Sequence, residues 1–213
     1  MGMTNVTATA AASAATTRKP APGAAETRIL DAAKRCCEQF GIAKVTVDDI
    51  AAAAGVSRAT LYRLFPGGKD VLFEALRVRE MTDFFDTLTA DVAGIDDFEE
   101  LVVQLLASAT RELRADEHLA IMLAAEPGET LSQLTVDGLP RIINVANAYL
   151  TPMVHPYLDG RRAAALIDLL VRATISYFLA PSDHVDLGDP ASARGFLAPL
   201  LATFAPPEPS PTA

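Results

Sequence analysis

The sequence contains no run of apolar residues long enough to cross a membrane, although half of its 213 residues are hydrophobic. It has only two cysteines, Cys36 and Cys37, which lack the CxxC spacing of a metal site and are too close for a relaxed disulfide. Its three histidines, His118, His155 and His184, are scattered. HExxH, GxSxG, P-loop and GxGxxG patterns are missing. These absences argue against an enzyme, and no metal or cofactor is expected.

The two cysteines lie in a segment with helical periodicity, so at least one should face a core. We predict buried free thiols, with a redox role as the alternative. Residues 1–25 are rich in Ala, Thr and Pro but lack the leucine-rich centre of a signal peptide. We interpret them as a disordered tail, and residues 206–213, with their four prolines, as a second one. The cytoplasm is therefore the expected location.

The net charge of −9 is unevenly distributed along the chain. Residues 1–70 carry nine Lys or Arg and six Asp or Glu, a balance of +3. Residues 71–213 carry nine basic and twenty-one acidic residues, a balance of −12. A basic end on an otherwise acidic chain favours contact with a polyanion at that end only.

The most informative stretch is TVDDIAAAAGVSRATLYRLF, residues 46–65, which predicts two short helices joined by a tight turn. Thr46 is placed to cap the first helix, with Asp49 in the capping-box position. Gly55 can adopt the left-handed conformation that ends a helix. Ser57 is placed to cap the second helix. The buried face of that helix is expected to be Leu61, Leu64 and Phe65.

This pattern is typical of a helix-turn-helix, whose second helix enters the major groove of DNA. Polar side chains on that helix can donate to base edges or phosphates. The candidates are Ser57, Arg58, Thr60, Tyr62 and Arg63. The alternative is a helix pair that only packs within an all-α protein, with Tyr62 as a packing aromatic.

A further helix is predicted on each side of this stretch. From Glu26 to Phe40 apolar residues recur at helical spacing, and Gly41 ends the segment. Together these helices form a predicted DNA-binding domain, residues 26–68, centred on Phe40, Ile50, Leu61 and Phe65. A break at residues 66–68 precedes a helix of about twenty residues from Lys69, long enough to tie two parts of the protein together.

Residues 69–205 are predicted to form a larger ligand-binding and dimerisation domain. After the long helix, segments are expected at about 96–114, 116–125, 129–136, 140–158, 161–179 and 190–204. Pro152 and Pro156 should kink or end the fourth of these. The predicted fold class is all-α, with about nine helices in total.

Residues 59–72, ATLYRLFPGGKDVL, extend the pattern. With the helices before them, they resemble the DNA-binding end of the TetR family of bacterial transcriptional regulators, over residues 26–76. The resemblance rests on the first helix, the helix-turn-helix, the Tyr-x-x-Phe pattern and the lysine that follows. The doubled Gly67-Gly68 departs from the family, because it lengthens the spacer before Lys69 by one residue.

The resemblance implies an all-α homodimer that binds a palindromic double-stranded operator. A lysine at a helix N-terminus also favours phosphate on physical grounds, since the backbone amides there attract anions. The family's phosphate-contacting positions match Thr46, Tyr62 and Lys69, and its recognition-helix positions match Ser57, Arg58, Thr60 and Arg63.

The C-terminal domain has enough apolar helix surface for a ligand cavity as well as a core. Walls rich in Met and Phe adapt to elongated apolar ligands, which favours a small hydrophobic effector such as a fatty acyl chain or related lipid. Each candidate could equally be ordinary core. The candidates are Phe85, Leu88, Leu101, Leu105, His118, Met122, Ile143, Asn147, Leu150 and Met153, with Met81 and Phe84 as further wall residues.

The segment 161–179 is apolar on most sides, so with 190–204 it could form a four-helix interface between two copies. The family resemblance also implies a dimer interface at these last two helices. The candidates are Leu166, Leu170, Ile175, Phe178, Phe196 and Leu200.

The resulting hypothesis is a repressor without enzymatic activity that leaves its operator when an effector binds. The effector would act by favouring another position of the helix from residue 69 to about 90. Two alternatives stay open. One is a transcriptional activator of the same fold, and the other is a helical ligand-binding or protein-interaction module that does not bind DNA.

Overall fold

The computed structural model describes residues 23–204, and the regular structure within them is all α-helical, as predicted. The tails predicted at 1–25 and 206–213 lie outside this range, except that α1 already begins at Ala24. The helices are α1 (Ala24–Phe40), α2 (Val47–Ala54), α3 (Arg58–Leu64), α4 (Lys69–Asp91), α5 (Phe98–Ala115), α6 (Glu117–Ala125), α7 (Pro127–Leu134), α8 (Leu139–Val154), α9 (Gly160–Leu179) and α10 (Pro190–Phe204).

Residues 23–204 form ten helices where about nine were expected, and the segment predicted at 129–136 forms α7, with Pro127 in its first turn. Aspartates fix the starts of several others. The carboxylates of Asp97, Asp116 and Asp159 accept backbone N–H groups at the starts of α5, α6 and α9. α8 ends at Val154, two residues beyond Pro152. None of the helices in residues 23–204 is long and apolar enough to cross a membrane.

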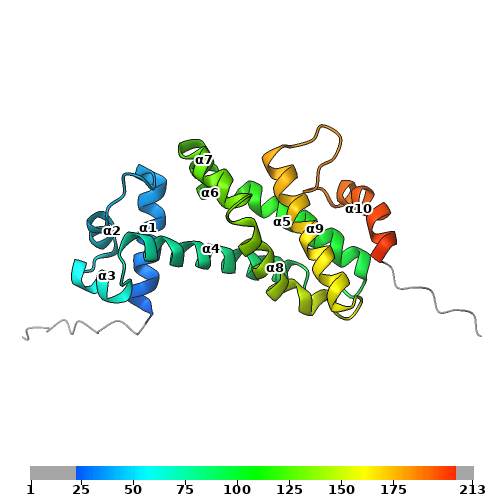
Figure 1. The fold of residues 1–213 in the computed structure, drawn as a ribbon, viewed down its shortest axis with the longest axis horizontal. Coiled ribbons are helices and arrows are strands. Elements are labelled where there is room, and N and C mark those ends of the chain that lie inside the picture. The colour runs from blue at the N-terminus through cyan, green and yellow to red at the C-terminus, as the bar shows by residue number, and fades with distance from the viewer. Residues whose placement is uncertain (1–22, 205–213) are drawn as a thin grey trace, which may run out of the picture.

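The helices form two bodies connected by α4 (Figure 1). α1, α2 and α3 make the smaller body at one end, and α5, α8, α9 and α10 belong to the larger body at the other. α4 runs from the first body into the second. α6 and α7 lie on one side of the molecule, and α6 also contacts α1.

Each body has its own hydrophobic core, and α4 contributes to both. Leu72, Phe73 and Leu76 pack with the core of α1, α2 and α3, whereas Phe85 and Leu88 pack with the larger core. The packing therefore divides α4 between the two bodies: its first turns pack with the smaller body and its later turns with the larger one. A movement of α4 within the larger body would carry the smaller one with it.

Phe40 was predicted at the centre of the smaller body, and this prediction is wrong. Its side chain is 48% exposed, whereas Ile50, Leu61 and Phe65 are buried as predicted. Phe40 continues the apolar stripe of α1, but it is the last residue of that helix, and the chain turns away at Gly41 with φ 78°. The apolar stripe of α1 thus extends beyond the part of α1 that the neighbouring helices cover.

The cysteines are both buried and free, as predicted. Burial, followed by the neighbouring Cys36, raises the pKa of the Cys37 thiol to about 12. Burial also raises the pKa of Cys36. Because the thiolate is the reactive form, these pKa values favour packing over redox chemistry.

Candidate DNA-binding and ligand-binding sites

The turn between α2 and α3 has the geometry that the sequence predicts. Thr46 caps α2 in a capping box: its hydroxyl accepts the Asp49 N–H at 3.2 Å, and its own N–H donates to Asp49 Oδ2 at 3.0 Å. The hydrogen bond from the Thr46 hydroxyl lowers the pKa of Asp49, with a further contribution from the Thr46 N–H. Gly55 ends α2 in the left-handed region, with φ 65° and ψ 36°. The two helices are thereby held at a fixed angle.

The first turn of α3 is organised by two hydroxyl groups. Ser57 Oγ accepts the Thr60 N–H at 3.1 Å, and the hydroxyls of Ser57 and Thr60 lie 2.9 Å apart. Ser57 is exposed and Thr60 is half-buried. Both predicted contact residues therefore also serve as the local cap of α3, which fixes the direction of the helix.

Arg58 and Tyr62 contact each other on the outer face of α3. The Arg58 guanidinium lies over the Tyr62 ring, 5.5 Å from its centroid, and donates to Asp48 Oδ2 at 3.1 Å. The interaction with Tyr62, followed by the charge of Asp48, raises the pKa of Arg58. Tyr62 remains 40% exposed. Arg63 is also exposed, and within residues 23–204 it has no ion-pair partner.

The doubled glycine positions Tyr62 as well as α4. Gly68 has φ 70°, and a Cβ there would lie 3.1 Å from Tyr62 Cε1. Gly68 therefore combines a left-handed backbone with a close aromatic contact, and a residue with a side chain would be strained on both counts. The doubled glycine, which departs from the family spacing, thus leaves the space that the Tyr62 ring of α3 occupies.

Lys69 begins α4, as predicted, but its ammonium group turns into the protein. Nζ donates to the carbonyl oxygen of Ile42 at 2.6 Å and lies 5.6 Å from the Phe73 ring centroid. To contact a phosphate through its side chain, Lys69 would have to exchange this bond. Its contact with DNA stays a prediction, and the observed bond ties α4 to the loop before α2.

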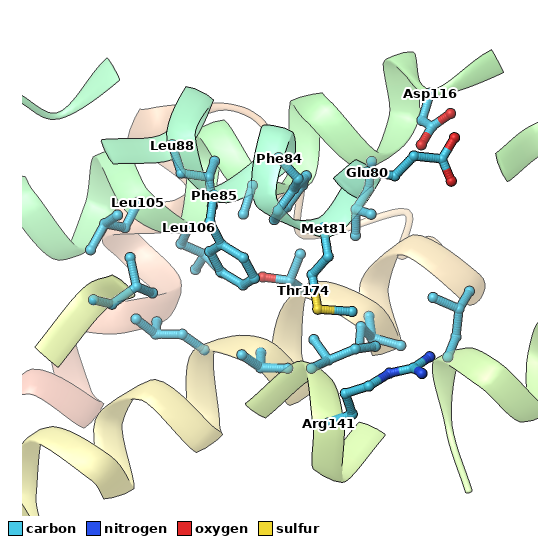
Figure 2. A pocket seen from close by; sticks show the side chains of 18 of the residues that line it. Glu80, Met81, Phe84, Phe85, Leu88, Leu105, Leu106, Asp116, Arg141 and Thr174 are labelled. Atoms are coloured by element: carbon cyan, nitrogen blue, oxygen red, sulfur yellow. The ribbon is translucent and has the colours of Figure 1, made fainter. Parts of the chain in front are cut away.

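A cavity of about 230 Å³ lies within the larger body, among α4, α5, α7, α8 and α9 (Figure 2). Most of its walls are apolar. Met81 and Phe84 of α4 line it beside Phe85, whose ring stacks on Tyr149 at 5.4 Å. Thr174 of α9 also lines it, and the polar residues at its edge are Arg77, Glu80, Asp116, Gln133 and Arg141.

The cavity includes four of the ten predicted effector residues: Phe85, Leu88, Leu105 and Leu150. The other six do not line it. Leu101 and Met122 are buried elsewhere, Met153 packs against the larger core, and Ile143 lines a separate hollow. The Asn147 amide donates to the carbonyl oxygen of Ile143 on its own helix, so it is already occupied. Periodicity identified the apolar faces of α5, α6 and α8, but it could not show which turn of each faces the cavity.

The polar residues at the edge of the cavity were not predicted. Glu74 Oε2 accepts Arg77 Nε and Nη2 at 3.0 and 2.6 Å, and Glu74 Oε1 accepts Arg141 Nη1 at 2.7 Å. Arg141 Nη2 donates to Gln133 Oε1 at 3.3 Å. Charged residues on amphipathic helices usually face water, so the sequence carries little signal for this cluster beyond the Glu74–Arg77 spacing.

Gly138 allows α7 and α8 to approach each other closely at this cluster. A Cβ on Gly138 would lie 1.7 Å from the Gln133 carbonyl oxygen, a distance that only a backbone shift could relieve. The close turn brings Gln133 of α7 and Arg141 of α8 to the same end of the cavity.

His118 lies outside the cavity, at the junction between the two bodies. Its Nδ1 is 3.9 Å from Glu38 Oε1 of α1, and its Nε2 is 3.9 Å from Glu80 Oε1 of α4. Lys34 Nζ of α1 lies 3.2 Å from the same Glu80 oxygen, an ion-pair distance without hydrogen-bond alignment. Glu126, after α6, accepts the backbone N–H of Ala43 at 3.0 Å. The His118 imidazole, predicted to bind the effector, therefore lies at the junction between the two bodies.

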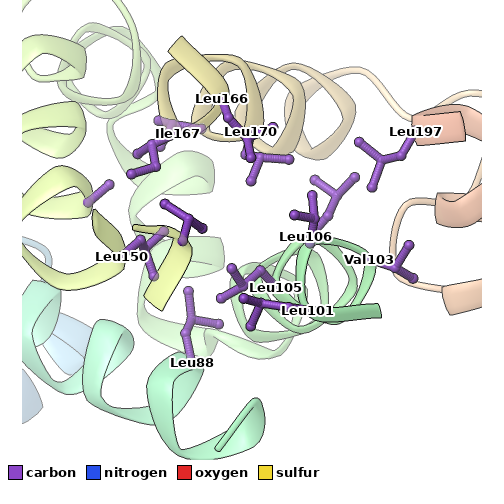
Figure 3. Close-up of a cluster of buried hydrophobic side chains, with 14 of the residues drawn as sticks. Leu88, Leu101, Val103, Leu105, Leu106, Leu150, Leu166, Ile167, Leu170 and Leu197 are labelled. Atoms are coloured by element: carbon purple, nitrogen blue, oxygen red, sulfur yellow. The ribbon is translucent and has the colours of Figure 1, made fainter. Parts of the chain in front are cut away.

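The predicted dimer residues divide into two groups. Leu166, Leu170 and Ile175 are buried in the chain's own core, and Leu170 and Ile175 line the cavity. Figure 3 shows Leu166 and Leu170 of α9 facing α5. These three residues are not on an outer face, because the apolar surface of α9 that the sequence assigns to a partner is covered by α5 and α8. Phe178, Phe196 and Leu200 are half-buried and stay predicted interface residues.

Residues 23–204 contain no group of three or more His, Cys, Asp or Glu side chains that could hold a metal ion. The site thus consists of two parts: a helix-turn-helix with an exposed polar face, and an apolar cavity connected to it through α4. This combination is typical of DNA-binding transcriptional regulators.

Comparisons with known proteins agree with this class. The family model of bacterial regulatory proteins of the tetR family matches residues 29–76. Rv2250c, an uncharacterized HTH-type transcriptional regulator of Mycobacterium tuberculosis, is 33% identical over 156 residues, which are 70% of this chain and 78% of the relative. The chain therefore belongs to the TetR family of transcriptional regulators, and the predictions of that family and of a regulator rather than an enzyme are confirmed.

Two solved structures share the fold. The TetR family repressor AlkX from Dietzia sp. strain DQ12-45-1b, implicated in biodegradation of n-alkanes, has a TM-score of 0.61 and 22% identity, covering 84% of this chain and 96% of that one. FadR from Bacillus subtilis, in complex with stearoyl-CoA, has a TM-score of 0.51 and 21% identity, covering 80% and 96%. At these identities the likeness establishes the fold alone.

Proposed function

We propose that this protein is a homodimeric transcriptional repressor in the cytoplasm, released from a palindromic operator by a small hydrophobic molecule bound in the cavity. One observation carries the proposal: Glu80 lines the cavity, and its carboxylate also forms an ion pair with Lys34 of α1. A ligand in the cavity thus contacts a residue that holds the smaller body in place.

The DNA side of the proposal rests on α3. Arg63 is exposed and without an ion pair in the described part of the chain, so it is available to a base edge or a phosphate. Arg58 can exchange Asp48 for a phosphate, because both groups of that pair are exposed. Ser57, Thr60, Tyr62 and Thr46 would position α3 on the DNA backbone.

The ligand side rests on the shape and chemistry of the cavity. Its volume of about 230 Å³ is below the roughly 300–1,000 Å³ of typical drug-sized sites, which favours a slender chain over a ring system. Met81, Phe84 and Phe85 offer flexible and aromatic contacts to such a chain. AlkX is implicated in biodegradation of n-alkanes and FadR was solved in complex with stearoyl-CoA, and both support an aliphatic ligand.

The connection between the two sides runs along α4. Its first turns pack in the smaller body and its later turns line the cavity, so a shift that makes room for the ligand moves both. Two copies joined through α9 and α10 would then present their α3 helices at a changed separation. The ligand releases the operator only to the extent that it binds the shifted state more tightly.

The proposal is tested by fluorescence anisotropy with labelled DNA from upstream of the protein's own gene. We expect specific binding, weakened by salt and by Arg63→Ala, and a fall in affinity when hexadecanoic acid or hexadecan-1-ol is added. Arg114→Ala provides a matched control, because Arg114 is an exposed arginine of α5 paired with Asp186, and it belongs neither to α3 nor to the cavity lining nor to the proposed interface helices α9 and α10. Failure of the protein to prefer this DNA or any genomic fragment over random sequence would refute it.

A further inference from the structure

We propose that the ligand of this cavity has an anionic head group, held by Arg141 and Arg77 in exchange for Glu74. This inference rests on the proposed function, because it specifies the chemical class of the ligand in the same cavity. Its basis is an imbalance of charge at one end of the cavity.

Two guanidinium groups share a single carboxylate at that end. Arg77 binds one oxygen of Glu74 and Arg141 binds the other, so the three side chains together carry one excess positive charge. The Arg77 hydrogen bond, with a smaller contribution from Arg141, lowers the pKa of Glu74, which keeps it ionised as the resident counter-ion. Both arginines line the cavity, whereas Glu74 does not.

Arg141 also has unused hydrogen-bonding capacity. Its Nη1 donates to Glu74 and its Nη2 to the neutral amide oxygen of Gln133 at 3.3 Å. Its Nε is buried and has no hydrogen-bond partner among the described residues. A buried N–H group without an acceptor is costly, and an oxygen of a bound carboxylate would satisfy it with a charge-assisted hydrogen bond.

The acidic residues at the cavity edge do not cancel this charge. Glu80 lies against Lys34 at 3.2 Å, and Asp116, whose Oδ1 accepts the backbone N–H of Leu119, lies at the start of α6. Figure 2 shows Glu80 and Asp116 close together and Arg141 well apart from them. The end of the cavity at Arg141 is therefore the positive one.

The arrangement fits an amphipathic molecule. Its chain would occupy the apolar space beside Met81, Phe85 and Leu105, and its anion would reach Arg141. The anion would then compete with Glu74 for the two guanidinium groups. A neutral hydrocarbon would fill the same space but would leave Arg141 Nε without an acceptor.

Isothermal titration calorimetry below micelle-forming concentrations tests this with three probes of equal chain length: hexadecanoic acid, hexadecan-1-ol and hexadecylamine. We expect the acid to bind at least about tenfold more tightly than the alcohol, with the amine weakest. Arg141→Gln should lower acid affinity far more than alcohol affinity, so that the advantage of the acid is lost. Glu74→Gln should increase acid affinity, since it frees both arginines, and Arg172→Gln should change nothing.

Alcohol binding by Arg141→Gln shows that the variant is folded with its cavity intact. Hexadecanoyl-coenzyme A is a fourth probe, because its phosphates are an alternative source of the anion. Tighter binding of this probe than of the acid, with the same dependence on Arg141, would support the inference and identify the source. Equal binding of acid and alcohol, or preference for the amine, would overturn the inference alone. Binding of none of the probes would overturn both it and the ligand half of the proposed function.

Discussion

The carboxylate of Glu80 lies 3.2 Å from the ammonium group of Lys34, and this ion pair joins a cavity-lining residue of α4 to the first helix of the DNA-binding body. His118 of α6 lies 3.9 Å from the same oxygen. Three helices thus meet at one carboxylate. This ion pair therefore adds an electrostatic contact to the apolar packing of α4, which contributes to both cores.

The first prediction concerns this joint. Glu80→Gln keeps the shape of the side chain and removes its charge, so Lys34 loses its partner and α1 is held less firmly against α4. We expect operator binding to persist while the loss of affinity caused by hexadecanoic acid becomes smaller, as measured by anisotropy. Arg114→Gln breaks a comparable ion pair with Asp186 away from the joint, and it should leave the response intact. An unaltered response in Glu80→Gln would mean that the signal takes another route.

A second prediction concerns Gly68. Gly68→Ala places a Cβ 3.1 Å from Tyr62 Cε1 and forces a side chain into a backbone conformation with φ 70°. We expect a loss of roughly 1 kcal/mol or more in stability and a weaker operator complex, because α3 loses its support. Gly128→Ala is the control, since a Cβ there meets nothing within 4 Å. Equal melting temperatures and equal operator affinities for the two variants would contradict the support role of Gly68.

Leu166 provides a third prediction, which separates core from interface. Its side chain is 0% exposed within the single chain. Leu166→Ala should therefore reduce the free energy of unfolding by about 2–5 kcal/mol. Phe178→Ala, at a half-buried position on the same helix, should mainly weaken dimerisation. Sedimentation velocity combined with urea unfolding distinguishes the two effects. The assignment fails if Leu166→Ala dissociates the dimer without destabilising the subunit.

The fourth prediction uses the pH dependence of stability. The Cys37 thiol ionises with a pKa near 12 in the folded chain and near its ordinary 9.0 when unfolded. Between these values only the unfolded state loses the proton, so the free energy of unfolding should fall as the pH rises from about 9 toward 12. Below pH 9 this stabilisation is fully present. In urea unfolding at a series of pH values, the free energy of unfolding of Cys37→Ala should fall less steeply with pH than that of the parent protein. Identical pH dependences would refute the assignment.

The local signals of the sequence predicted the helix-turn-helix well. The capping box of Thr46 and Asp49 and the left-handed Gly55 are short-range features, determined by residues three or four positions apart. The same reasoning failed for Phe40, because its exposure depends on where the neighbouring helices end. Periodicity identifies an apolar stripe but not the length over which another helix covers it.

The cavity was only partly predictable for a related reason. Phe85, Leu88, Leu105 and Leu150 were found because the cavity is an extension of the core. Arg77 and Arg141 were missed, since their meeting at Glu74 depends on α4 and α8 lying side by side, 67 residues apart in sequence. His118 was predicted as an effector-binding residue, but its partners Glu38 and Glu80 come from two other helices.

The central claim, that a molecule in the cavity releases the operator, is tested most directly by filling the cavity. Ala109 lines the cavity from α5, and Ala109→Phe would occupy part of its volume of about 230 Å³ without touching α3. The measurement is operator affinity by anisotropy, with and without hexadecanoic acid, for the parent protein and this variant. The account predicts that the acid weakens the parent complex and has little effect on the variant. An equal loss of affinity in both proteins would contradict it, because the ligand would then act from another site.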